Sequence, residues 1–269
     1  MSRWRHLADG LIRRLHRSRV LRSIGKAVLR DRIVRQPFHG GTICLDAVDQ
    51  SWAWTGTVRL EQWDRDIQDR LLDLSRDCQV MLDIGSNVGV MALAVALRNP
   101  AIRVVCVEPN ARACQLLRRS FALNHVDDRM SVIEAVAAGS DEDVRFDETG
   151  STTGHISESG GLIRKGVDVA RLAEGLLATG RCMMKMDVEG FEAILLKEIH
   201  RIPHREKLVL VAELHARGFN GMGDPGACIA RLRDSGATLV HVAGPPLHAL
   251  DRWTDDLLTM QIEARWSAV

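Results

Sequence analysis

The sequence has no hydrophobic run long enough to cross a membrane. Its longest apolar stretch without a charge, residues 84–97, is shorter than the roughly 20 residues of a membrane helix and contains Gly85, Asn87 and Gly89. The chain also lacks a net charge of either sign, since 36 basic and 35 acidic residues among 269 leave +1. We therefore expect neither a membrane-spanning protein nor, for the chain as a whole, a binder of polyanions.

Cysteine motifs are missing as well. None of the six cysteines forms a C-x-x-C pair or stands beside a histidine at the spacing of metal ligands, and no signal peptide is recognisable. Cys106 and Cys182 lie in apolar runs, where a buried thiol acts as a small hydrophobic side chain. These features predict a reducing, cytoplasmic location without a disulfide framework.

Hydrophobic residues make up 46% of the chain, enough for one core but not for two full-sized domains. From residue 61 onward, short apolar runs alternate with amphipathic helical patterns. The runs are at residues 79–84, 103–107, 130–133, 182–186 and 208–214, with helices at 67–74, 90–97, 111–123, 169–177 and 191–199. A further helix at 227–235 and strands at 238–242 and 258–264 follow. This alternation predicts an α/β domain with a doubly wound, mostly parallel sheet over residues 61–269.

Residues 1–60 form a different region. Residues 1–35 contain eleven Arg or Lys and two Asp, with leucines near helical spacing. They predict a basic helical arm that either packs on the main domain or lies on an anionic membrane surface, with no specific nucleic acid expected. Residues 36–60 are expected to form short strands at 42–45 and 51–60. Trp52 and Trp54 would then share one strand face, as part of a core cluster or as a stacking surface for a sugar ring.

A glycine turn with an acidic residue follows the first predicted strand. Asp83, Gly85 and Gly89 give an acidic-x-Gly-x-x-x-Gly pattern, in which the backbone can approach a ligand beside a carboxylate. A dinucleotide fingerprint would need glycine where Asn87 and Val90 stand. Pyrophosphate binding is therefore disfavoured, and a nucleotide that carries an amine or a cation fits better.

The second predicted strand ends in Glu108, followed by Pro109. A carboxylate at this position of an α/β fold can accept hydrogen bonds from both ribose hydroxyls. The glycine turn and this carboxylate, on consecutive strands, predict S-adenosylmethionine as the cofactor.

Two further motifs follow the fourth and fifth predicted strands: KMDVEGFE at residues 185–192 and AELH at residues 212–215. With LDIGSNVG at residues 82–89 and VEP at residues 107–109, in this order, they resemble the FkbM family of S-adenosylmethionine-dependent methyltransferases over residues 61–218. That family usually has Ala where Ser86 stands. The resemblance implies a class I, Rossmann-like methyltransferase fold, whose seven-stranded sheet ends in an antiparallel strand. It also implies O-methylation of a carbohydrate or natural-product hydroxyl.

The resemblance implies roles for individual residues too. Glu108 would bind the ribose, and Glu134, after the third strand, would reach the adenine side. The residues at the methionine end of the cofactor would be Asp83, Gly85, Asn87 and Gly89.

The charged residues after the fourth and fifth strands have a physical interpretation of their own. Lys185 lies in a strand covered on both faces, so its ammonium needs a carboxylate from Asp187, Glu189 or Glu213, and a structural ion pair is the favoured interpretation. Because the carboxyl ends of neighbouring parallel strands meet at one edge, these acids should cluster with His215.

We expect His215 to be the general base, oriented by Glu213 or Asp187, since histidine ordinarily titrates near neutral pH. Two alternatives remain: Asp187 is the base, or Asp187, Glu213 and His215 bind a divalent cation that orients a sugar diol. No metal is expected to be required.

Three other possibilities remain open. His155 lies in a stretch rich in Gly, Ser and Thr that is either a mobile lid over the acceptor or an ordinary connection. A nicotinamide oxidoreductase is disfavoured by Asn87 and Val90. A non-catalytic, methyltransferase-like module that docks through the basic arm is the main alternative function.

Overall fold

The computed structural model describes residues 28–29, 31–55, 58–148, 154–156, 161–215, 225–242 and 259–268. Within these ranges, no helix is both long enough and apolar enough to cross a membrane. All six cysteines are described, and each is buried and free; the burial of Cys106 and Cys182 was predicted. Most of the basic arm, apart from residues 28–29 and 31–35, lies outside the described residues.

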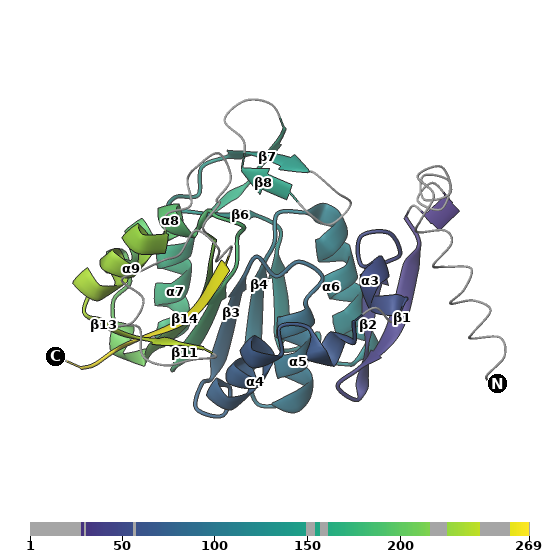
Figure 1. The fold of residues 1–269 in the computed structure, drawn as a ribbon, viewed down its shortest axis with the longest axis horizontal. Helices are drawn as coiled ribbons and strands as arrows, with labels where there is room; N and C mark the ends of the chain where they lie inside the picture. Colours follow the sequence, from purple (N-terminus) through teal and green to yellow (C-terminus); the bar gives the residue numbers. More distant parts are fainter. Residues whose placement is uncertain are drawn as a thin grey trace.

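A central sheet organises the described part of the chain, with seven strands in the order β13-β14-β12-β11-β3-β4-β5 (Figure 1). Five of its strands pair in parallel, and the last strand in the sequence is antiparallel to both of its neighbours. Its strands are β3 (Val80–Ile84), β4 (Arg103–Val107), β5 (Met130–Ile133), β11 (Cys182–Met186), β12 (Leu208–His215), β13 (Ala237–His241) and β14 (Thr259–Trp266). This order confirms the doubly wound class I fold, including its antiparallel last strand.

Helices cover both faces of the sheet, which explains why the inner strands are apolar throughout. In β3, Met81 belongs to one core cluster and Leu82 to the other, because successive side chains in a strand point to opposite faces. One face packs on α4 (Arg65–Leu74), α5 (Val90–Arg98) and α6 (Ala111–Leu123). The other packs on α7 (Val169–Leu177), α8 (Glu192–Leu195), the 3₁₀ helix η2 (Leu196–Arg201) and α9 (Pro225–Asp234). The helix expected at 191–199 is therefore part α and part 3₁₀. A further 3₁₀ turn, η3 (Arg205–Lys207), precedes β12.

The segment before α4 packs against α6. The hairpin of β1 (Ile33–Phe38) and β2 (Gly41–Asp46) is tied there by a hydrogen bond of 2.9 Å from Cys44 N to Ser120 Oγ. The prediction of a strand at 51–60 was wrong. Residues 51–54 form the short helix α3 (Ser51–Trp54), and the 3₁₀ turn η1 (Leu60–Gln62) follows. The Asp46 carboxylate accepts hydrogen bonds from the backbone of Val48 and Asp49, which turns the chain before α3.

Five short strands between β5 and α7 were not predicted. They are β6 (Val136–Ala138), β7 (Val144–Glu148), β8 (Gly154–Ile156), β9 (Leu162–Arg164) and β10 (Gly166–Asp168). β6 pairs with β10, and β7 pairs with β8 and β9. In Figure 1, β7 and β8 lie above the central sheet. Runs this short give too little hydrophobic periodicity to be recognised. His155 is part of β8, but its side chain lies outside the described residues.

Candidate active site

The strand order reverses between β3 and β11, which are neighbours in the sheet although β3 is followed in sequence by β4 on its other side. In an open α/β sheet the ligand crevice lies beyond the carboxyl ends of the strands at this switch point. The motifs at residues 82–89, 107–109, 185–192 and 212–215 all fall there, at the ends of β3, β4, β11 and β12. The fold thus brings together residues that lie as much as 133 positions apart in the sequence, from 82 to 215.

The turn after β3 is shaped by backbone contacts. Gly85 has a φ of +74°, and a Cβ at this position would lie 1.8 Å from the carbonyl oxygen of Asp187. Gly89 has a φ of +86°, and its Cβ would lie 2.3 Å from Leu117 Cδ2. Asn87 also has a positive φ, of 48°, which Asn tolerates better than most residues. The glycines allow the turn to pack against β11 and α6, and so fix the crevice wall.

Glu108 is held at the end of β4 by the backbone. Its Oε2 accepts a hydrogen bond of 2.8 Å from Asn87 N, and its Oε1 accepts one of 2.9 Å from Asn110 N. The side chain is 6% exposed, and burial raises the pKa of Glu108 to about 7 although both backbone donors oppose the rise. Each carboxylate oxygen keeps a second lone pair, so Glu108 retains the capacity to accept from ribose hydroxyls.

Asp83 is almost fully buried, 1% exposed. It is the register partner of Lys185 on β11, and its Oδ1 lies 3.7 Å from Lys185 Nζ. Neither carboxylate oxygen has a hydrogen-bond partner among the described residues, and burial raises the pKa of Asp83. A buried carboxylate with unused acceptors fits a ligand that carries an amine.

Lys185 is paired as expected. Its Nζ lies 3.1 Å from Asp187 Oδ2 and 3.4 Å from the Gly85 carbonyl oxygen. Burial alone would lower the pKa of Lys185, but the charges of Asp187 and Asp83 outweigh it and hold the pKa above its ordinary value. The ammonium therefore stays charged and joins the turn after β3 to the end of β11. Asp83 was not foreseen as a partner of this lysine.

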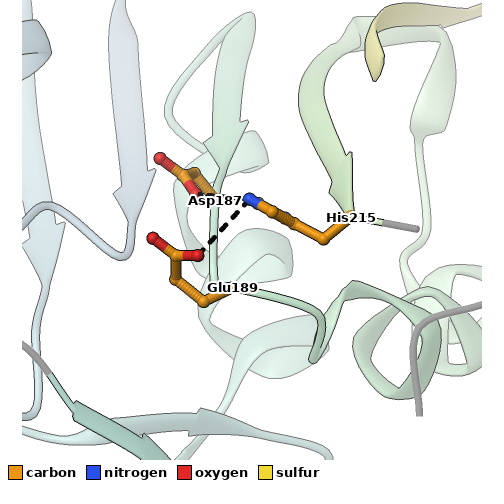
Figure 2. A group of neighbouring side chains, drawn as sticks. All are labelled: Asp187, Glu189 and His215. Atoms are coloured by element: carbon orange, nitrogen blue, oxygen red, sulfur yellow. Dashed lines mark ion pairs between the residues drawn. The ribbon is translucent and has the colours of Figure 1, made fainter. Parts of the chain in front are cut away.

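His215, the last residue of β12, faces carboxylates on both ring nitrogens, and Figure 2 shows the two on one side, Asp187 and Glu189. Nδ1 lies 3.1 Å from Glu192 Oε1, whereas Nε2 lies 3.6 Å from Glu189 Oε2 and 3.9 Å from Asp187 Oδ1. Burial lowers the pKa of His215, but the Glu192 hydrogen bond and the charges of Glu192, Asp187 and Glu189 outweigh it and raise the pKa to about 9. The residue that orients the ring is therefore Glu192, rather than Asp187 or Glu213.

A group of three side chains could hold a metal ion. One ligand atom each from Asp187, Glu189 and His215 lies within 4.8 Å of the others. The set expected from sequence contained Glu213 in place of Glu189. The difference arises in the turn after β11, where Glu189 has a φ of 53° and its side chain points toward His215 (Figure 2).

Two acids complete the charged edge. Burial and the charges of Asp187 and Asp64 raise the pKa of Glu213 to about 7. Asp64, just before α4, was missed by sequence reasoning; burial and the charge of Asp187 raise its pKa as well. Glu192 was missed too, although it closes the KMDVEGFE motif. No local signal marks Asp64, because it reaches the site from a segment about 120 residues away in sequence.

Glu134 differs from the other expected cofactor residues. Its side chain is 37% exposed and lies 3.2 Å from Arg118 Nη1 on α6. It stands after β5, on the same sheet edge as Glu108.

A family model described as the methyltransferase FkbM domain matches residues 83–234, more than half of the chain. The chain belongs to the FkbM methyltransferase family. Its cofactor is S-adenosylmethionine, as the motifs predicted. The residues of the structure fit this molecule, because the Asp83 carboxylate has no hydrogen-bond partner among the described residues and suits an amine, and Glu108, directly after β4, keeps lone pairs that can accept from hydroxyls.

The individual proteins to which this FkbM-family protein is similar match it over a short segment or at low sequence identity. A ribosomal RNA small subunit methyltransferase G from Methylobacterium radiotolerans is 40% identical over 82 residues, and the match spans 28% of this chain and 39% of that protein. A methyltransferase from Geobacter sulfurreducens is 19% identical in sequence, with a TM-score of 0.45 over 76% of this chain and 80% of that chain. M. jannaschii TYW2, solved in complex with AdoMet, is 12% identical, with a TM-score of 0.47 over 88% and 87%.

Proposed function

We propose that this FkbM-family protein transfers a methyl group from S-adenosylmethionine to a hydroxyl oxygen of a carbohydrate or natural-product acceptor. S-adenosylmethionine supplies that methyl group on a positively charged sulfur. The observation that carries the proposal is His215, whose Nε2 faces Glu189 and Asp187 at the carboxyl edge of the sheet. A histidine at this edge can remove the proton that a hydroxyl must lose when it is methylated.

The charge of this edge favours a neutral acceptor. Asp64, Asp187, Glu189 and Glu213 are all acidic, whereas the Lys185 ammonium is buried and already paired. A molecule rich in hydroxyl groups can donate hydrogen bonds to these carboxylates, but one rich in phosphates would be repelled. This supports a polyol acceptor rather than RNA, the substrate class in the name of the Methylobacterium relative.

His215 can act as the base through one tautomer. Nδ1–H donates to Glu192, which leaves the lone pair of Nε2 free to accept a proton from the acceptor hydroxyl. With a pKa of about 9, only about a tenth of the molecules hold a neutral imidazole at pH 8. The same carboxylates that reduce this fraction stabilise the imidazolium once it has taken the proton. Asp187 is the alternative base, since it lies beside both His215 and Lys185.

Lys185 and Gly85 serve positioning. Lys185 holds the Asp187 carboxylate against the turn after β3, and the missing side chain of Gly85 lets the two strand ends approach. Correct placement of the acceptor oxygen relative to the methyl group provides a large part of the rate enhancement in such reactions.

The test uses S-adenosylmethionine with a CD₃-labelled methyl group, incubated with the full-length protein and cell extracts of polar metabolites and glycans. Mass spectrometry should find the label in an ether-linked methyl group on a neutral acceptor. Label in RNA or protein, or none in any product while calorimetry shows cofactor binding, would contradict the proposal. The second of these outcomes would support the non-catalytic binding module instead.

We also infer that residues 1–35, with eleven basic and two acidic residues, contact an anionic membrane surface. Full-length protein should pellet with vesicles that contain phosphatidylserine, and less so in high salt. The matched truncation begins at residue 28, so that the hairpin from Ile33 onward remains intact. Pelleting that is equal for both chains, or independent of salt, would contradict this inference.

A further inference from the structure

A pair of tryptophans stacks near the start of α4. The rings of Trp52, on α3, and Trp63, immediately before Asp64, have centroids 4.2 Å apart and an interplanar angle of 28°. Trp63 is nevertheless 40% exposed, whereas indole rings in most cores bury a large apolar area. The sequence suggested that Trp52 and Trp54 share a strand face, but both lie in the helix α3, and Trp52 stacks on one side of Trp63.

The backbone of Trp63 is firmly held. Gln68, which is 2% exposed, donates through Nε2 to the carbonyl oxygens of Trp63 at 2.5 Å and of Leu60 at 2.7 Å. Its Oε1 lies 2.9 Å from His39 Nε2. The helix that carries Gln68 is itself fixed to β14 through two contacts between Arg70 and Glu263, of 2.5 and 2.9 Å. An exposed ring on so rigid a support loses little conformational freedom when a ligand stacks on it.

Asp64 links this ring to the acceptor side of the site. Asp64 and Asp187 interact electrostatically, as do Asp64 and Glu213. Glu213 lies on the same face of the sheet as Val211, which packs in the core cluster that contains α4. α4 ends at the amino edge of the sheet, where Asn99 Nδ2 donates a hydrogen bond of 2.6 Å to the Ser75 carbonyl oxygen, so its start, with Asp64 and the preceding Trp63, lies toward the carboxyl edge that carries Glu213 and His215.

We propose that Trp63 is a platform on which a neutral sugar ring of the methyl acceptor stacks, while Asp64 and Glu213 accept hydrogen bonds from its hydroxyls. A pyranose matches both features, because its C–H face is apolar and its edge carries hydroxyl donors. A flat apolar molecule would leave the carboxylates without donors, and an acidic sugar would be repelled by them. The proposal rests on the proposed function and adds to it the class of acceptor.

The test is saturation-transfer NMR of full-length protein with S-adenosylhomocysteine and a panel of methyl glycosides: glucoside, galactoside, mannoside, rhamnoside and glucuronide. At least one neutral glycoside should bind with its ring C–H protons most strongly saturated, and the glucuronide should bind more weakly. Trp63→Ala should raise the Kd of that glycoside about tenfold, near the upper end for one aromatic contact, and Trp63→Phe should raise it less.

Leu123→Ala is the matched control. Leu123 is 39% exposed, but it ends α6, at the opposite edge of the sheet, and its loss should leave the Kd unchanged. Calorimetry with S-adenosylhomocysteine checks that each variant is folded. If Trp63→Ala does not bind S-adenosylhomocysteine, the glycoside Kd of Trp63→Phe is compared with that of Leu123→Ala instead. Equal Kd values for wild type and the Trp63 variants, or no neutral glycoside bound by wild type, would overturn the platform. The CD₃-transfer assay distinguishes failure of the sugar platform from failure of the proposed function. Methylation of a hydroxyl compound that is not a sugar would contradict the sugar platform alone.

Discussion

The two halves of the site are built in different ways. At the proposed cofactor side, Glu108, directly after β4, is held by backbone groups, as Asn87 N and Asn110 N both donate to it. At the proposed acceptor side, side chains hold one another: Lys185 pairs with Asp187, and His215 pairs with Glu192 on α8.

The difference determines what a substitution changes. Backbone donors stay in place when a side chain is replaced, so changes at Glu108 should remain local to the cofactor. In a network of side-chain charges, each replacement alters the pKa of its neighbours. Variants on the acceptor side should therefore change catalysis and its pH dependence, and variants on the cofactor side should change affinity.

The largest effect is expected at His215. His215→Ala should lower kcat about 10²- to 10⁴-fold, the usual contribution of a positioned base, with the affinity for S-adenosylmethionine nearly unchanged. Steady-state kinetics with calorimetry checks this, and His200→Ala, an exposed histidine on η2, is the control. A His215→Ala enzyme with a kcat near that of wild type would rule out the base and leave the role to Asp187.

On the cofactor side, Glu108→Ala should weaken binding of S-adenosylmethionine by about 1.5–3 kcal/mol, the range for hydrogen bonds to a charged acceptor. Calorimetry measures this directly, and NADH should not bind to wild type. Because the effect should be confined to binding, kcat at saturating cofactor should change far less than in His215→Ala. Unchanged affinity would show that Glu108 does not hold the ribose.

The pH dependence distinguishes the two bases. If His215 is the base, kcat should rise about tenfold per pH unit and level off above a pH of about 9, because only the neutral imidazole accepts a proton. Glu192→Gln should move this inflection to lower pH, since it removes the negative charge that stabilises the imidazolium. NMR titration of the His215 ring measures its pKa in the free protein without activity, and Glu192→Gln should lower that pKa too. An inflection at or below pH 7 in wild type would contradict His215 as the base and assign the role to a carboxylate at this edge of the sheet.

The smallest effect is expected from metal removal. Asp187 already pairs with the Lys185 ammonium, and His215, protonated near neutral pH, lies beside Asp187 and Glu189, so these two carboxylates have cationic neighbours without a metal ion. EDTA should leave kcat unchanged. Loss of activity that Mg²⁺ or Mn²⁺ restores would instead assign Asp187, Glu189 and His215 as ligands. Glu189→Gln, which removes one charge from that group, would then weaken the response to the metal.

Much of the fold was predictable because its signals are local. Buried parallel strands are short apolar runs, and the helices between them show a period of 3.6 residues, so all seven strands of the central sheet were placed to within about two residues. The exceptions were also local. Residues 51–54 are helical despite their tryptophans, because Asp46 turns the chain before them, and β6 to β10 are too short to show a pattern.

The sequence by itself determined the order of the motifs, and with it the sheet, the family, the cofactor and the residues at each strand end. Only the tertiary structure decided which of those residues meet. It set Glu192 rather than Asp187 or Glu213 on Nδ1 of His215, and it placed Asp64 where it interacts electrostatically with Asp187. It also raised the pKa of His215 to about 9. The physical reason is that strand-end motifs depend on backbone conformation, which a few neighbouring residues specify. The protonation of a buried side chain depends on every charge around it, and these charges come from segments far apart in the sequence.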